Sequence, residues 1–134
     1  MIRVVIAEAH AIVRQRLEQL CRDAHDVTVD GVSTGPAELL QQVDSLRPDL
    51  AIMGLSRQPA SVLQGLRSLK CRHPNIPVIL MSLYDHDSYA VCALEAGATG
   101  YLMLEHAGEQ LIETIRMFVL GGPFVTEQGR FAAI

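Results

Sequence analysis

The chain has 134 residues, 49% of them hydrophobic and 19% charged, which suits one compact domain and argues against disorder. The net charge of −4, with no run of Lys or Arg, gives no electrostatic footprint for direct binding of nucleic acid. No apolar stretch reaches the roughly 18 residues of a membrane span, and the first residues lead directly into a strand pattern rather than a signal peptide. Three widely spaced cysteines indicate reduced thiols rather than a metal site, so we expect a cytoplasmic protein.

Strand patterns and helix patterns alternate five times along the chain. The predicted elements, in order, are a strand over 2–7, a helix over about 11–24, a strand over 27–32, a helix over 37–46, a strand over 49–53, a helix over about 61–72, a strand over 77–83, a helix ending near 96, a strand over 99–103 and a helix over about 108–120. Such alternation predicts an α/β fold, a doubly wound parallel sheet with helices on both faces. The flavodoxin-like strand order 2-1-3-4-5 is the natural solution at this length.

The helices carry apolar residues near helical spacing. In the first helix these are Ile12, Leu17 and Leu20, while arginines and a glutamate occupy much of the remaining surface. In the last helix Leu111 and Ile115 are expected to face inward. These stripes predict that each helix covers one face of the sheet.

The working site of a doubly wound sheet lies at the carboxyl ends of its strands, where the strand order reverses. In this chain that rule brings Glu8, Ala9 and Gly54 side by side, after the first and third strands. Ser82 and Leu104, from the fourth and fifth strands, are expected to join them.

Four stretches, in this order and at this spacing, resemble the receiver domains of bacterial response regulators, in the LuxR/NarL-type branch. They are VVIAEAHAIVR at 4–14, RPDLAIMGLS at 47–56, HPNIPVILMS at 73–82 and ALEAGATGYL at 93–102. The resemblance covers about residues 2–122 and implies a receiver domain at 1–122. Residues 123–134 resemble the start of an interdomain linker, which implies a C-terminal DNA-binding domain that is not present in this chain.

The resemblance also implies a chemistry that this chain has largely lost. Receiver domains use two adjacent acidic residues and an acceptor aspartate to bind Mg²⁺, and a Ser or Thr and a Lys to hold the phosphoryl oxygens. The matching positions here form a degenerate phosphorylation pocket of Glu8, Ala9, Gly54, Ser82 and Leu104. Glycine offers no nucleophile, leucine no cation, and one carboxylate is too little for Mg²⁺. We expect no catalytic residue, no cofactor and at most weak Mg²⁺ binding.

Several residues around this pocket need separate consideration. Tyr101 matches the family's switch aromatic, which moves inward on activation, but a half-buried structural aromatic is the simpler reading. Glu8 either accepts hydrogen bonds from backbone amides, pairs with Arg57 of the pocket loop, or is a solvated carboxylate. Ser56 in the same loop lacks an adjacent general base and is a poor nucleophile.

Three functions are compatible with these observations. The first is an atypical response regulator, not an enzyme, that signals without aspartyl phosphorylation through a fixed or partner-selected conformation and homodimerisation. The second is a sensor that binds a small metabolite in the degenerate pocket. The third, phosphorylation at another residue, is disfavoured because no carboxylate replaces Gly54. A protein partner is possible in each case, and DNA would be bound only through the further domain.

Overall fold

The structure is a computed structural model, and it describes residues 1–55, 58–82 and 87–120. Its strands are β1 (Ile2–Ala7), β2 (Val27–Ser33), β3 (Leu50–Gly54), β4 (Val78–Ser82) and β5 (Gly100–Met103). Its helices are α1 (Ala11–Asp23), α2 (Pro36–Leu46), α3 (Pro59–Arg72), α4 (Asp87–Ala96), the short 3₁₀ helix η1 (Leu104–His106) and α5 (Ala107–Leu120). The five strands form one parallel sheet in the order β2-β1-β3-β4-β5, which confirms the predicted fold class.

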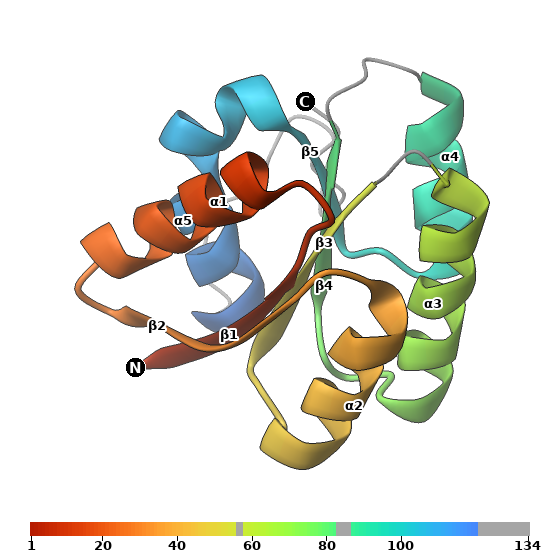
Figure 1. Ribbon diagram of the computed structural model, residues 1–134, viewed down its shortest axis with the longest axis horizontal. Helices are drawn as coiled ribbons and strands as arrows, with labels where there is room; N and C mark the ends of the chain where they lie inside the picture. Colours follow the sequence, from red (N-terminus) through yellow and green to blue (C-terminus); the bar gives the residue numbers. More distant parts are fainter. Residues whose placement is uncertain (56–57, 83–86, 121–134) are drawn as a thin grey trace.

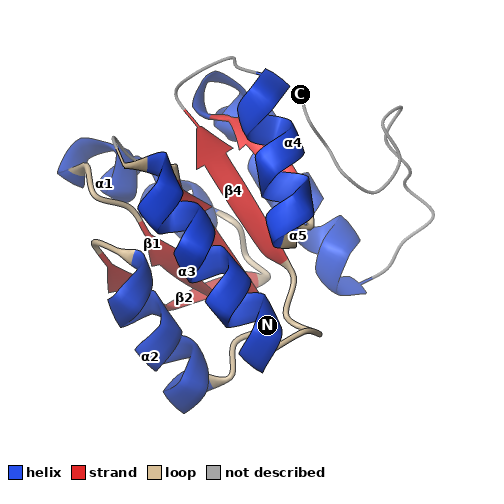
Figure 2. Cartoon of the chain, turned by 90° about the vertical axis from the view of Figure 1, so that its right-hand side faces the viewer, coloured by secondary structure: helices blue, strands red, loops and turns tan. Residues whose placement is uncertain are grey.

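The sheet lies between two layers of helices. Figure 1 shows α1 and α5 on one face and α2, α3 and α4 on the other, and Figure 2 shows α3 between α2 and α4. Strands β1, β3 and β4 are buried along nearly their whole length, because helices cover both of their faces. Their near-continuous apolar sequences follow from that position.

Alternate residues of each strand divide the core in two, since successive strand side chains point to opposite faces. On β3, for example, Ala51 and Met53 pack toward α2, α3 and α4, whereas Leu50 and Ile52 pack toward α1 and α5. Both halves are buried, so a shift of register by one residue would exchange the two sets completely.

The apolar stripe of α1 differs from the prediction by one position. Ile12, expected to face inward, is 83% exposed, whereas Leu17 and Cys21 are fully buried and Val13 is half-buried. Residues 13, 17 and 21 follow each other at four-residue spacing on one face, and residue 12 lies about 100° around the helix from residue 13. Burial raises the pKa of the Cys21 thiol to about 12, with a smaller contribution from the carboxylate of Glu18.

Several other element boundaries differ from the prediction by one or two residues. Helix α3 begins at Pro59, two residues earlier than expected, because proline at the first helical position lacks only an N–H that would be unpaired there. Strand β5 ends at Met103 as predicted but begins at Gly100, one residue later than expected, and Leu104 follows it as the first residue of η1. The predicted linker, 123–134, lies outside the described residues.

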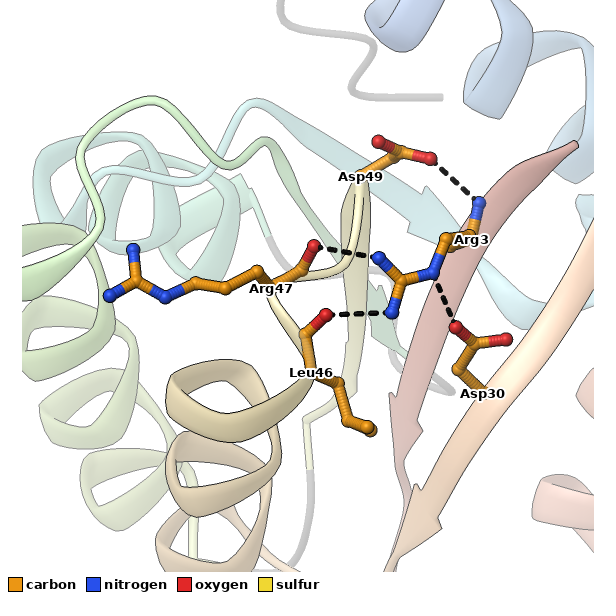
Figure 3. Close-up of polar contacts among 5 residues, drawn as sticks. All are labelled: Arg3, Asp30, Leu46, Arg47 and Asp49. Carbon is orange, nitrogen blue, oxygen red and sulfur yellow. Dashed lines mark hydrogen bonds and ion pairs between the residues drawn. The ribbon is translucent and has the colours of Figure 1, made fainter.

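Charged side chains tie the end of the sheet remote from the predicted site. The register of β1 and β2 shifts where Asp30 forms an extra residue, and the Asp30 carboxylate accepts a hydrogen bond of 2.6 Å from Arg3 Nε. The same guanidinium donates to the carbonyls of Leu46 (2.6 Å) and Arg47 (3.2 Å) at the end of α2, and the Arg3 amide donates to Asp49 (2.9 Å), as Figure 3 shows. Arg3 therefore joins β1, β2 and the α2–β3 connection.

A second ion pair fastens α5 to the loop before β2. Arg116 Nε and Nη2 each donate a hydrogen bond of 2.8 Å to the carboxylate of Asp26. This two-pronged contact lowers the pKa of Asp26 to about 2, with the Arg116 hydrogen bonds as the largest cause.

Candidate functional site

The carboxyl ends of β1, β3 and β4 meet at one edge of the sheet, as the strand order predicts. In the register, Ala7 pairs with Met53 of β3, and Gly54 pairs with Met81 of β4. Two backbone hydrogen bonds extend this edge, from Glu8 N–H to the Ser33 carbonyl (3.0 Å) and from Leu55 N–H to the Met81 carbonyl (2.7 Å). The positions predicted from β1, β3 and β4 are therefore neighbours.

The Glu8 side chain turns inward over Gly54. Glu8 is only 5% exposed, and its Oε1 accepts a hydrogen bond from the backbone N–H of His10 (3.1 Å) and lies 2.9 Å from His10 Nδ1. The other oxygen, Oε2, lies 1.5 Å from the point that a Cβ atom on Gly54 would occupy. The carboxylate thus fills the space in which any side chain at position 54 would begin.

This arrangement decides between the readings of Glu8. The prediction of a solvated carboxylate is wrong, because Glu8 is buried. The prediction that it accepts a hydrogen bond from a backbone amide is confirmed, because His10 N–H donates to it. Pairing with Arg57 lies outside the described residues, as does Ser56. His10 occupies the N-cap position of α1 but makes no side-chain cap, since its ring contacts Glu8 instead.

The turn that carries Glu8 is held from the first turns of α1. Arg14 Nη1 donates a hydrogen bond of 2.9 Å to the Glu8 carbonyl oxygen, and Arg14 N–H donates to the His10 carbonyl (2.9 Å). The backbone from Glu8 to α1 is therefore fixed at the same end as the side chain. In the sequence this arrangement is visible only as a Glu-x-His turn after the first strand and a glycine at the end of the third, two signals that lie 44 residues or more apart.

Glu8 lines two small cavities. One, of about 30 Å³, is lined among others by Glu8, Ala9, Thr34, Pro36 and Gly54. The other, of about 10 Å³, is lined by Glu8, Val13, Leu55, Met81, Ser82 and Leu104. The predicted pocket residues are thus brought together around Glu8, but in two compartments. A cavity of this size holds about one water molecule.

The donor set does not fit Mg²⁺. Among the described residues lining the two cavities, Glu8 alone supplies a carboxylate, and one of its oxygens is already engaged by His10. Within the described ranges, no three His, Cys, Asp or Glu residues come together as metal ligands would. Mg²⁺ prefers six oxygen ligands in near-ideal octahedral geometry, and one carboxylate with an oxygen already engaged does not provide them.

The remaining predicted residues lie as follows. Ser82 ends β4 and is almost completely buried, and Leu104 borders the smaller cavity from η1. Tyr101, in the middle of β5, is 3% exposed and belongs to the core beneath α3 and α4. The expectation of a half-buried Tyr101 is therefore wrong, because its ring points inward.

One buried polar contact escaped the sequence analysis. His73, at the end of α3, is buried, and its Nε2 lies 2.7 Å from the carboxylate of Asp44 on α2, which also pairs with Arg72. The hydrogen bond to His73 is the largest cause that lowers the pKa of Asp44. This cluster joins α2 to the end of α3.

Comparison with known proteins gives one family. Residues 4–116 match the "Response regulator receiver domain". The chain is 27% identical over 128 residues to the response regulator GacA of Pseudomonas viridiflava, covering 96% of this chain and 60% of GacA. It is also 27% identical over 126 residues to the transcriptional regulatory protein DegU of Brevibacillus brevis, covering 92% of this chain and 52% of DegU. The chain thus spans little more than half the length of these curated relatives.

Solved structures give the same fold. The signal receiver domain of the response regulator NarL from Mycobacterium tuberculosis superposes with a TM-score of 0.82 at 21% identity, covering 90% of this chain and 98% of that one. A LuxR-family two-component response regulator from Aurantimonas superposes with a TM-score of 0.84 at 19% identity, covering 98% and 89%. None of the helices in the described part of the chain has the length and apolarity to cross a bilayer. The chain belongs to the response regulator receiver domain family.

Proposed function

We propose that this chain is the regulatory domain of an atypical response regulator of the LuxR/NarL-type branch, one that signals without phosphorylation at position 54. The observation that carries the proposal is the end of β3, where Gly54 has no side chain and the Glu8 carboxylate lies in its place. A phosphoryl acceptor needs a nucleophilic oxygen at this point, and the transferred group needs positive charge around it. Gly54 supplies no oxygen and Leu104 supplies no cation.

The interior of the domain supports a conformation that is set without phosphate. The Tyr101 side chain is buried in the core. The resemblance associates this inward position of the switch aromatic with the active state of a receiver domain. In a two-state receiver, phosphate supplies the free energy that shifts the equilibrium between the states. A domain without that input must populate its active state already, or a partner must supply the bias through its greater affinity for one state.

Transcriptional regulation is the proposed output. Relatives such as DegU are named as transcriptional regulators and extend well beyond the region matched here. The proposal therefore places DNA binding in a further domain and gives this chain the part of a homodimerising or docking module. The second candidate, a metabolite sensor, is weakened because the two cavities that the described residues form beside Glu8, of about 30 and 10 Å³, are much smaller than a metabolite.

The test is whether the pocket still responds to a phosphoryl mimic. Backbone amide resonances of the 134-residue chain are recorded with and without Mg²⁺ and beryllofluoride, which mimics an acyl phosphate when a carboxylate holds it. The matched control is the variant Ala9→Asp/Gly54→Asp/Leu104→Lys, which restores the groups the family's chemistry requires and in which the new side chain at position 54 must displace the Glu8 carboxylate from its present position.

We expect shifts in the triple variant and none in the unmodified chain. Saturable shifts of the amides of Gly54, Ser82 and Tyr101 in the unmodified chain would contradict the proposal. Incubation with acetyl phosphate and measurement of intact mass provides an independent check, because a covalent phosphoryl group at any residue would be detected.

A further inference from the structure

The glycine at position 54 is required by its neighbour rather than by its backbone. Among the described glycines, φ is positive only at Gly97, so the Gly54 backbone is one that residues with side chains adopt readily. The space beside it is the constraint. A Cβ on Gly54 would lie 1.5 Å from Glu8 Oε2 and 2.6 Å from Glu8 Cδ, far inside van der Waals contact. With Glu8 in this position, residue 54 can only be glycine.

The Glu8 carboxylate is also held where it lies. Burial of a charged group costs free energy unless hydrogen bonds replace those it made to water. A residue in a turn at the end of a strand could instead point its side chain into solvent. Here Glu8 is 5% exposed and receives the His10 N–H and the contact with His10 Nδ1, while Arg14 fixes its carbonyl. These contacts hold the carboxylate over Gly54.

We propose that Glu8 is a built-in occupant of the degenerate pocket, an autoinhibitory contact that Gly54 admits and His10 secures. The inference rests on the proposed function and extends it by identifying what holds the pocket shut. Glu8 lines both cavities, of about 30 and 10 Å³, and its carboxylate places a negative charge beside them. It thereby excludes anionic ligands by volume and by charge, and it couples the end of β3 to the first turn of α1.

A double-mutant cycle measures this contact directly, because it isolates the interaction between two residues from their separate effects. The variants are Gly54→Ala, Glu8→Ala and the two combined, each made in the full 134-residue chain. In the Gly54→Ala variant, which keeps Glu8, the new methyl group must displace the Glu8 carboxylate. We expect the unfolding equilibrium constant to rise about tenfold, as for other overpacked sites. In the Glu8→Ala background the methyl meets no carboxylate, and we expect a change below about threefold.

The matched control is Gly35→Ala. Gly35 lines the same cavity, but a Cβ there would meet no atom within 4 Å, so its effect should be equal in the two backgrounds. Glu8→Gln serves as the conservative variant, since an amide keeps the shape and an acceptor oxygen, and it should retain most of the coupling to Gly54→Ala.

Hydrogen exchange of the His10 amide is the second readout. Its N–H donates to Glu8 Oε1, so exchange should accelerate in Gly54→Ala and in Glu8→Ala, with no further increase when both are present. Equal effects of Gly54→Ala in the two backgrounds, with unchanged His10 exchange, would overturn the inference.

These readouts do not use a phosphoryl mimic, so the two proposals can be contradicted separately. A response of the unmodified chain to beryllofluoride would contradict the proposed function. Absence of the coupling between Glu8 and Gly54→Ala would contradict only the inference that Glu8 occupies the pocket.

Discussion

Gly65 on α3 is the site where a single methyl group should test the packing of the two helices beside the pocket. A Cβ on Gly65 would lie 2.3 Å from Pro36 Cβ and 3.2 Å from Pro36 Cγ, at the first residue of α2. Carbon atoms in ordinary contact lie about 3.5–4.0 Å apart, so the helices would have to separate by more than about 1 Å. The neighbour is a rigid ring that cannot rotate away.

Two opposing terms set the magnitude for Gly65→Ala. Alanine in a helix interior is favoured over glycine by about 0.5–1 kcal/mol, whereas overpacking costs about 1–3 kcal/mol. The overlap of more than an ångström places the cost above the gain, and we expect a net destabilisation of about 1 kcal/mol. For a domain of this size that corresponds to a fall in Tm of about 3–5 °C.

Thermal and urea unfolding followed by circular dichroism measure this change, with Gly108→Ala as the control. A Cβ on Gly108 would approach only Arg16 Nη2, at 3.2 Å, which is the end of a flexible side chain. The control should be neutral or stabilised by up to about 1 kcal/mol. If Gly65→Ala proves as stable as Gly108→Ala, the close contact of α2 and α3 does not limit the packing and the reasoning is wrong.

Two further predictions concern charge and thiol chemistry. The folded-state pKa of Asp26, about 2, lies below its ordinary value of 3.8. The ion pair of Asp26 with Arg116 therefore stabilises the fold above pH 4, and this stabilisation is lost as the pH falls from about 4 to 2. The difference in urea midpoint between the unmodified chain and Asp26→Asn should therefore narrow over that range, and a difference independent of pH would contradict the assignment. Iodoacetamide at pH 8 should alkylate the exposed Cys71 first and Cys21 only after unfolding, because the Cys21 thiol is buried with a pKa of about 12. Peptide mass analysis gives the order, and early labelling of Cys21 would show that α1 opens in the native state.

The strands could be predicted because the sheet is buried on both faces. Apolar runs such as 2–7 and 78–82 are continuous in the sequence for the same reason that they are central in the fold. Helix boundaries were less certain, since Pro59 fits both a loop and the first turn of a helix. The position of Ile12 was wrong because a stripe defined by three residues leaves an uncertainty of one position, and one position is about 100° of rotation.

The site could be predicted by position but not by conformation. Strand order and strand ends are enough to bring Glu8, Gly54 and Ser82 to one edge of the sheet. They do not determine the rotamer of Glu8. Its inward turn depends on the space left by Gly54, 46 positions later, and on the N–H donor of His10, two positions later. Such a contact is a property of three-dimensional packing, and no periodicity in the sequence reports it.

The Arg3 cluster bears on how the sheet forms. The side-chain and amide partners of Arg3 lie 27 to 46 residues later in the chain and are Asp30, Leu46, Arg47 and Asp49. Strand β1 likewise pairs with β2 and β3, which both follow it in the sequence. Strand β1 therefore obtains its neighbours only after loops of up to about 50 residues have closed, and that closure has to precede any gain from pairing. Until then the apolar stretch 2–7 lacks its partners in the sheet, and Arg3 places a charge within it.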